Sequence, residues 1–377
     1  MSDTLRRQRQ KKIITKIDAL GFLQKSNSGI ILMVVLWLLV ILTTLAVGLG
    51  RRTSIDLALT KHALGRTKSY YTAFGGLIYA MSQISEDKKD PITSKFDTLY
   101  QCAVTLQENQ TMDELFKDIP LGEGSFSVYF TVQDQDAKDM LIHYGLRDED
   151  SKININATTQ QNHKVLRELI KLLGVDQDAA LTITYSIIDW KDQDTQPKES
   201  YYGAEDEYYL GLQEPYKAKN APLESLEELL LIKGMTPGLY AQLEDFLTIY
   251  PKATTGLKVN VHTASQTVLR ALFRSVVGPA TNTIEDDADS LAAKIVMFRR
   301  GIDGVEGTPD DRQVDSNEMN LNAKERTIFL ATRGYMTDTS RYIKVQVRGI
   351  DQDSGIGTDM VAIVDRDDLT IVGWKRN

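Results

Sequence analysis

Cysteine is almost absent from this chain of 377 residues, with Cys102 as the single example. One cysteine cannot form an intramolecular disulfide, so the folded part must be stabilised without one. Histidine is scarce too: the four histidines are scattered and do not form the H-E-x-x-H pattern of zinc peptidases. Neither a G-x-S-x-G nucleophile motif nor a phosphate-binding P-loop occurs. These absences predict that the chain is not an enzyme.

Charge is missing from one long stretch and unevenly placed elsewhere. Residues 30–50 form a run of 21 residues without a charged side chain. Residues 1–29 contain seven Lys or Arg and two Asp, a net charge of +5. The whole chain carries −8, which leaves −13 for the part after residue 29. An acidic head argues against general binding to the phosphates of a nucleic acid, which requires clustered cations.

The apolar run has the length of a membrane span. As a helix it would be about 31 Å long, close to the thickness of a bilayer core. The basic segment before it favours an N-terminus that stays in the cytoplasm. A secretory signal peptide fits poorly because the run is long and no small-x-small cleavage site follows. Two interpretations remain: a simple membrane anchor, or a signal that is cut directly after Gly29 and leaves the apolar helix on the mature protein.

Apolar periodicity predicts an α+β fold. Helical spacing continues from the apolar run to about residue 85, although Gly75 and Gly76 weaken the pattern. Strands are predicted at 125–132, 140–146, 341–349, 360–365 and 369–374, and helical patterns dominate between residues 157 and 335. The simplest architecture is a long N-terminal α-helix packed on an antiparallel sheet, with a large all-α domain inserted into the sheet. Its predicted parts are residues 1–29, 30–85, 86–156, 157–335 and 336–377.

The predicted inserted domain contains an internal repeat. KININATT at 152–159 precedes a helix with the sequence VLREL, and KVNVHTAS at 258–265 precedes one with VLRAL. Each copy is an extended segment followed by a polar helix cap and an amphipathic helix. The two copies predict a duplicated helical module. Farther along, Ser225 and Glu228 form a capping box, and Pro237 is placed where the first turn of a helix tolerates proline.

Residues 231–243 resemble a helix-hairpin-helix, a motif that binds DNA phosphates in some proteins. The hairpin of the DNA-binding versions has a second glycine, which Gly234-Met235-Thr236 lacks, and Lys233 is the only nearby cation. A structural αα-hairpin is the simpler interpretation. The alternative, a DNA-contacting module in a type IV pilus-like or DNA-uptake machine, remains open at this stage.

Two groups of acidic residues are candidates for a cation site. The first lies on two connected loops and comprises Asp189, Asp192, Asp194, Glu205 and Asp206. The second comprises Asp303, Asp310 and Asp311. Ca²⁺ prefers hard oxygen ligands, and carboxylates this dense repel one another unless a cation is present. The spacing is not that of an EF-hand, and solvated loops or helix caps are the simpler alternative.

Several motifs together resemble the general secretion pathway protein K family, the large minor pseudopilins of type II secretion systems. The resemblance covers most of the chain after Gly29, although residues 279–320 have no clear counterpart. It is carried by Gly29 before IILMV, by ININ-A at 153–157, by IIDW at 187–190, by GAEDEYY at 203–209, by PYKAKNAP at 215–222, by SLEEL at 225–229, by KGMTP at 233–237, by VNVHTAS at 259–265 and by SRY at 340–342.

The resemblance implies a pilin-like fold and a role in protein secretion. It implies that a prepilin peptidase cuts between Gly29 and Ile30, that Ile30 is then N-methylated, and that a single span of the inner membrane places the head in the periplasm. It further implies Ca²⁺ on the inserted domain, more strongly at Asp189–Asp206 than at Asp303–Asp311. The expected partners are the minor pseudopilins I and J, with which the chain would cap a pseudopilus built from the major pseudopilin.

The fifth residue after the predicted cut supports a position at the tip. Major pilins have a glutamate there, which is usually taken to pair with the N-terminal amine of a neighbour. This chain has Val34 instead. A subunit without that carboxylate cannot make the pairing, which suits the end of a filament, and it avoids the cost of an unpaired charge in the bilayer.

Overall fold

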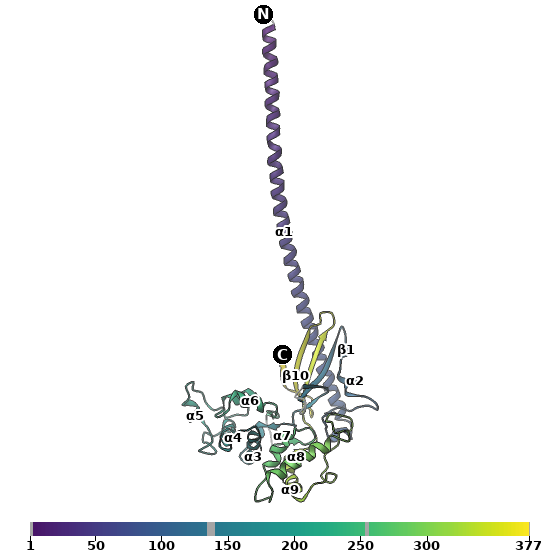
Figure 1. Cartoon of the computed structure of the whole chain (residues 1–377), viewed down its shortest axis with the longest axis vertical. Helices are drawn as coiled ribbons and strands as arrows, with labels where there is room; N and C mark the ends of the chain where they lie inside the picture. The colour runs from purple at the N-terminus through teal and green to yellow at the C-terminus, as the bar shows by residue number, and fades with distance from the viewer. Residues whose placement is uncertain (1–2, 134–139, 253–255, 377) are drawn as a thin grey trace. The chain divides into compact units, whose positions relative to one another are not determined.

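The computed structural model describes residues 3–133, 140–252 and 256–376, so residues 1 and 2 of the predicted leader lie outside the described residues. The chain divides into two units, residues 1–65 and 66–377, which we describe separately. Figure 1 shows a long N-terminal helix, a set of strands labelled β1 and β10, and a group of helices labelled α3 to α9. The predicted combination of a long helix, an antiparallel sheet and many helices is confirmed.

The first unit is helical. Helix α1 (Asp3–Asp87) begins upstream of the predicted start at residue 30 and passes Gly29 without a break. The side chains of the uncharged run are exposed, for example Leu32 at 69% and Leu42 at 63%. Within the described residues, α1 is the one helix long and apolar enough to cross a membrane, over Gly29–Asp87. An apolar side chain in water is unfavourable, so this surface requires a lipid or protein environment.

The second unit contains a seven-stranded antiparallel sheet. Its main path is β1 (Ile119–Leu121), β2 (Gly124–Gln133), β9 (Tyr342–Asp351), β10 (Gly357–Asp365) and β11 (Ile371–Arg376). Strand β3 (Met140–Tyr144) pairs with β2, and β4 (Arg147–Asp148) pairs with β9. The early and late strands therefore share one sheet, as predicted. The loop before it carries the short helices η1 (Thr93–Lys95) and α2 (Met112–Phe116).

The last part of α1 packs on this sheet through a narrow contact. Ala73, Leu77, Ala80 and Ile84 recur at helical spacing and are at most 1% exposed. Glycines on both sides allow the close approach. A Cβ at Gly76 would lie 2.7 Å from Val347 Cγ1, and a Cβ at Gly349 would lie 2.3 Å from the backbone nitrogen of Ala73. Side chains at these positions would force the helix off the sheet.

The inserted domain lies between β4 and β9 and has its own hydrophobic core, running from Ile153 to Met336. It is mainly helical: its α-helices are α3 (His163–Leu172), α4 (Gln177–Lys191), α5 (Asp206–Leu210), α6 (Pro237–Leu243), α7 (Gln266–Arg274), α8 (Glu285–Arg299) and α9 (Ala323–Thr332). The capping box at Ser225 is present, but the segment it starts is a 3₁₀ helix, η3 (Leu226–Leu231). The other 3₁₀ helices are η2 (Ile155–Ala157) and η4 (Arg333–Tyr335).

The two copies of the repeat have equivalent structures. Each begins with a two-residue strand in a parallel pair: β5 (Ile153–Asn154) pairs with β6 (Leu247–Thr248), and β7 (Val259–Asn260) pairs with β8 (Met336–Thr337). The asparagine that ends each strand accepts a hydrogen bond from the backbone N–H two residues later, at 2.8 Å for Asn154 and 3.0 Å for Asn260. Helices α3 and α7 follow these strands. The two copies thus share the same local structure, while the duplication itself stays a prediction.

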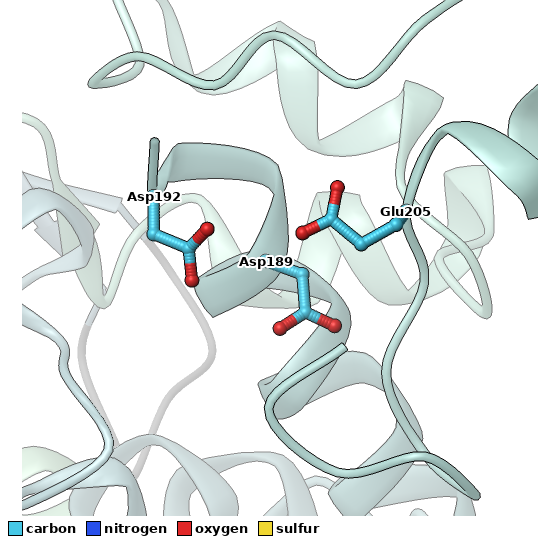
Figure 2. Close-up of side chains that lie close together, drawn as sticks. All are labelled: Asp189, Asp192 and Glu205. Carbon is cyan, nitrogen blue, oxygen red and sulfur yellow. The ribbon is translucent and has the colours of Figure 1, made fainter. Parts of the chain in front are cut away.

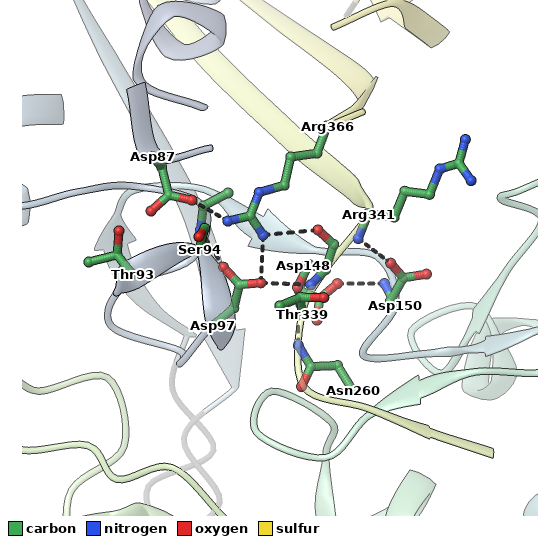
Figure 3. Close-up of polar contacts among 12 residues, drawn as sticks. Asp87, Thr93, Ser94, Asp97, Asp148, Asp150, Asn260, Thr339, Arg341 and Arg366 are labelled. Carbon is green, nitrogen blue, oxygen red and sulfur yellow. Dashed lines mark hydrogen bonds and ion pairs between the residues drawn. The ribbon is translucent and has the colours of Figure 1, made fainter. Parts of the chain in front are cut away.

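A buried polar network joins the inserted domain to the pilin-like part, that is, the end of α1 and the seven-stranded sheet. Figure 3 shows this network around Arg366. The Arg366 guanidinium pairs with Asp87 at the end of α1 and donates to Asp97 Oδ2 at 2.9 Å. Asp97 Oδ2 also accepts the backbone N–H of Ser340 at 2.6 Å. Asp150 Oδ2 accepts the backbone N–H of Arg341 at 2.6 Å. The chain passes between the sheet and the inserted domain twice, near residues 150 and 340, and buried carboxylates hold both places.

Candidate metal centre

The end of helix α4 and the loop that follows it bring three carboxylates together. Asp189 lies in the last turn of α4, Asp192 is the residue that ends the helix, and Glu205 directly precedes α5. One oxygen from each lies within 4.8 Å of the others. In Figure 2 the carboxylates of Asp192 and Glu205 face each other, with Asp189 beside them. Among the described residues, this is the one group of three or more potential ligands that close together.

Backbone groups fix Asp189 in place. Its Oδ1 accepts the N–H of Lys198 at 3.0 Å, and its Oδ2 accepts the N–H of Ala204 at 2.9 Å. The residue is fully buried. A Cβ on Gly203 would lie 2.1 Å from Asp189 Oδ2, so this position requires glycine. The sequence between the two acidic loops therefore wraps closely around one carboxylate.

Asp192 and Glu205 lack such hydrogen bonds. Both oxygens of each carboxylate are buried without a hydrogen-bond partner, and Glu205 as a whole is 3% exposed. Asp192 has one ion pair, in which Lys198 Nζ lies 3.2 Å from its Oδ2. An unsatisfied buried carboxylate is costly, because burial removes the water that would solvate it. These oxygens are consequently available to a ligand.

The electrostatics of the site disfavour full ionisation. Burial, together with the nearby charges of Asp189 and Asp192, raises the pKa of Glu205 to about 7. Burial also raises the pKa of Asp189 to about 6, against the lowering effect of its two backbone hydrogen bonds. Two protons, or one divalent cation, would relieve the repulsion. The donor set is hard oxygen, so the residues fit Ca²⁺ better than a thiolate-seeking metal.

Two residues of the first predicted group point elsewhere. Asp194 Oδ2 pairs with the ammonium of Lys198, and its Oδ1 accepts the N–H of Gln196 at 3.0 Å. Asp206 Oδ1 accepts the N–H of Ala218 at 2.9 Å and so holds the next segment against α5. Neither belongs to the group of three carboxylates. The structure thus narrows the predicted set of five to Asp189, Asp192 and Glu205.

The second predicted group is not gathered around a common point. Asp310 Oδ2 accepts the backbone N–H groups of Ile302 at 2.5 Å and Asp303 at 3.2 Å. Asp303 Oδ1 accepts the N–H of Val305 at 2.8 Å, and Asp311 Oδ2 accepts that of Gly307 at 3.1 Å. Asp303 and Asp310 thus shape their own loop. Asp311 Oδ2 also accepts the N–H of Tyr100 at 3.4 Å, its Oδ1 is buried without a hydrogen-bond partner, and burial raises its pKa to about 6. In the described residues these three carboxylates form no group of three potential ligands.

The residues of the predicted cleavage site lie on the exposed part of α1. Gly29 has no atom within 4 Å of the position of a Cβ, and Ile30 and Val34 are 62% and 52% exposed. Gly29 and Ile30 are therefore exposed to a peptidase, and Val34 to a neighbouring subunit. Cleavage after Gly29 and methylation of Ile30 stay predictions.

Sequence reasoning missed Lys198 and Gly203 as parts of the site. Lys198 contacts Asp189 through its backbone and Asp192 through its side chain. Lys191 was missed too: burial lowers its pKa to about 7, and its Nζ donates to the carbonyls of Ile155 at 2.5 Å and Thr158 at 2.8 Å. These roles depend on how the loop folds back, which spacing alone does not reveal.

Comparison with known proteins points to one family. The profile of the family described as "Type II secretion system (T2SS), protein K" matches residues 148–252, which include the three carboxylates. Type II secretion system protein K of Klebsiella pneumoniae is 27% identical over 266 residues, covering 71% of this chain and 74% of that protein. The protein of the same name from Aeromonas hydrophila is 37% identical over 116 residues, covering 30% of this chain and 35% of that protein.

A solved structure shares the fold. The crystal structure of the GspK-GspI-GspJ complex from the type 2 secretion system of enterotoxigenic Escherichia coli includes a chain that matches with a TM-score of 0.58. The match covers 84% of this chain and 99% of that one, at 20% identity. Together with the sequence matches and the long helix, antiparallel sheet and many helices described above, this leads to one conclusion. The chain is similar to the type II secretion system protein K family in sequence and shares the fold of the solved complex's chain.

Proposed function

We propose that this chain is a minor pseudopilin that caps the tip of the periplasmic pseudopilus and helps to start and limit its assembly during protein secretion. The inserted domain supports this role most directly. It is a second hydrophobic core placed between β4 and β9, so the subunit carries far more mass than a helix and sheet require. A head of that bulk would obstruct the addition of a further subunit above it.

The partners are the minor pseudopilins I and J, together with the major pseudopilin below them. The fold neighbour was solved with GspI and GspJ, which motivates this assignment. The test is co-purification of the full chain with tagged I and J from detergent-solubilised membranes. Recovery of a stoichiometric complex supports the role, whereas a chain that stays alone while I and J associate with each other contradicts it.

The exposed apolar run would anchor the chain in the inner membrane, with its N-terminus in the cytoplasm and its head in the periplasm. A prepilin peptidase would cut between Gly29 and Ile30, and Ile30 would be N-methylated. The exposure of both residues and the uncharged surface after them support this proposal. Intact-mass spectrometry of the membrane-extracted protein tests it: a mature chain that starts at methylated Ile30 is expected, and an intact leader contradicts it.

Asp189, Asp192 and Glu205 would hold a Ca²⁺ ion on the inserted domain. When bound, the ion supplies two positive charges that offset most of the repulsion among the three crowded carboxylates, and it joins the loop of residues 192–205 to the end of α4. The orphaned oxygens of Asp192 and Glu205 are the observation that supports this site. Thermal melting of the full chain in detergent, with calcium or with a chelator, tests it. A higher melting temperature in calcium is expected; identical melting in both buffers argues against the ion.

The alternative of a DNA-contacting hairpin has little support. Lys233 Nζ donates to the carbonyl of Gly203 at 3.1 Å and lies 5.1 Å from the centre of the Tyr208 ring. The one cation of the hairpin is therefore engaged within the inserted domain and unavailable to a phosphate. Retention of DNA by the protein at low and moderate salt is the discriminating experiment. Binding that weakens steeply as salt rises would revive the DNA-uptake interpretation.

A further inference from the structure

Lys198 has an unusual place relative to the three carboxylates of the candidate metal centre. Its backbone N–H donates to Asp189 Oδ1 at 3.0 Å, and its Nζ lies 3.2 Å from Asp192 Oδ2. Within the described residues, no other Lys or Arg forms an ion pair with Asp189, Asp192 or Glu205. One residue thus contacts two of the three proposed ligands, and it brings the ammonium that is ion-paired with Asp192.

We propose that Lys198 is an internal competitor for the cation: its ammonium occupies Asp192 in the metal-free protein and must release this carboxylate when the cation binds. The inference rests on the proposed calcium site. An ammonium and a divalent cation are both attracted to the same negative oxygens of Asp192, and neither oxygen is engaged by a protein hydrogen bond. Each ion therefore weakens the binding of the other.

The Lys198 ammonium has a second ion-pair partner to which it can move when it leaves Asp192. The Lys198 side chain is 28% exposed, and the same Nζ also pairs with Asp194, whose side chain is 53% exposed. Rotation of the flexible lysine stem can release Asp192 while the contact with Asp194 persists. Asp194, which stands outside the group of three carboxylates, then has a role as the resting place of the displaced ammonium. The loop would exchange an internal cation for an external one without unfolding.

Substitution of the side chain isolates this effect, because the backbone N–H that holds Asp189 is retained. Lys198→Met removes the charge but keeps an unbranched side chain of similar length. The full chain in detergent micelles is titrated with calcium in a calorimeter. Lys198→Met should bind Ca²⁺ about five- to tenfold more tightly than wild type, because a partly exposed ion pair of this kind is worth about 1 kcal/mol. Lys198→Arg, which keeps the charge, should bind more weakly than Lys198→Met.

A matched control separates the local effect from net charge. Lys89→Met removes the same charge from an exposed ion pair with Glu86 in the pilin-like part. It should leave calcium affinity unchanged. If Lys89→Met and Lys198→Met tighten binding equally, the effect is one of total charge and the competitor role is wrong.

Thermal melting provides the second readout. Without metal, Lys198→Met should melt at a lower temperature than wild type, because the carboxylates lose their internal counter-ion. In saturating calcium the order should reverse or disappear. A lysine with a purely structural role would lower the melting temperature in both conditions. Equal calcium affinities for Lys198→Met and wild type overturn the competitor role while the calcium site stands; no binding by either protein overturns both.

Discussion

The acidic residues of the inserted domain fall into two groups that look alike in the sequence and differ in the structure. In the loop of residues 301–311, Asp310 accepts bonds from the Thr308 hydroxyl and from two backbone N–H groups, which lower its pKa to about 2. At the end of α4, Glu205 has no such donors, and burial raises its pKa to about 7. A carboxylate that already accepts protein hydrogen bonds shapes its loop, whereas a buried one without donors is open to a ligand.

The strongest test of this difference between Asp310 and Glu205 is to remove the Glu205 carboxylate, which has no hydrogen-bond partner. Glu205→Gln should weaken calcium binding by about a hundredfold or more, because it deletes a charged ligand from a site of three. Calorimetric titration of the full chain measures this loss. Without metal the same variant should melt at a higher temperature than wild type, since a neutral amide is cheaper to bury beside Asp189 and Asp192 than an ionised carboxylate. A variant that binds calcium as wild type does would exclude Glu205 from the site.

Gly203 provides the next largest effect. Gly203→Ala places a Cβ where 2.1 Å separates it from Asp189 Oδ2, so the loop or the carboxylate must move. We expect a loss of about 1–3 kcal/mol in unfolding free energy, as is usual for overpacking a buried site, together with weaker calcium binding. Chemical denaturation with and without calcium measures both.

Gly238→Ala is the matched control for that variant. Gly238 lies in α6, and a Cβ there meets nothing within 4 Å. This change should be neutral or stabilise the protein by up to about 1 kcal/mol, because alanine favours a helix. If both alanine variants lose stability equally, close packing around Asp189 is not the cause.

The sequence predicted the fold much better than the site. Periodic apolar residues indicated the strands at both ends of the sheet, and KININATT and KVNVHTAS revealed the repeat, because these patterns are local. Gly75 and Gly76, which looked like weak points of the helix, are contact positions instead: a Cβ on either would clash with a side chain of the sheet. Likewise, spacing placed five acidic residues near α4, but only the folded loop shows that Asp194 and Asp206 turn to other partners.

The pH dependence of the metal-free protein distinguishes Glu205 and Asp189 from Asp310, whose pKa lies below its ordinary value. The folded-state pKa values of Glu205, about 7, and Asp189, about 6, lie above their ordinary values. Each group therefore favours folding more as the pH falls from about 7.5 toward 5. Calcium affinity should change in the opposite direction, because protons compete for the same oxygens. Asp150 and Asp311, also with pKa values of about 6, add to the rise in stability.

The contribution of the metal centre to this pH dependence is the difference in melting temperature between wild type and Glu205→Gln over this pH range. Melting temperatures without metal, taken at intervals from pH 5 to 7.5, should converge for the two proteins at low pH, where Glu205 is protonated, and diverge at high pH. Curves that stay parallel would mean that Glu205 does not titrate in this range.

The smallest effect is expected in the loop of residues 301–311. Asp310→Asn replaces a charged acceptor with a neutral amide. Its oxygen can still accept the N–H of Ile302 while its NH2 group donates to the Thr308 hydroxyl, so the backbone hydrogen bonds persist but are weaker without the charge. Hydrogen exchange at Ile302 and Asp303 should become faster. Since the pKa of Asp310 lies below its ordinary value, its stabilising effect is present above pH 4 and lost only as the pH falls toward 2. The calcium-dependent shift in melting temperature should stay at its wild-type value. If Asp310→Asn reduces that shift, the two acidic groups do not differ in function, and hydrogen-bond satisfaction fails as the criterion that separates them.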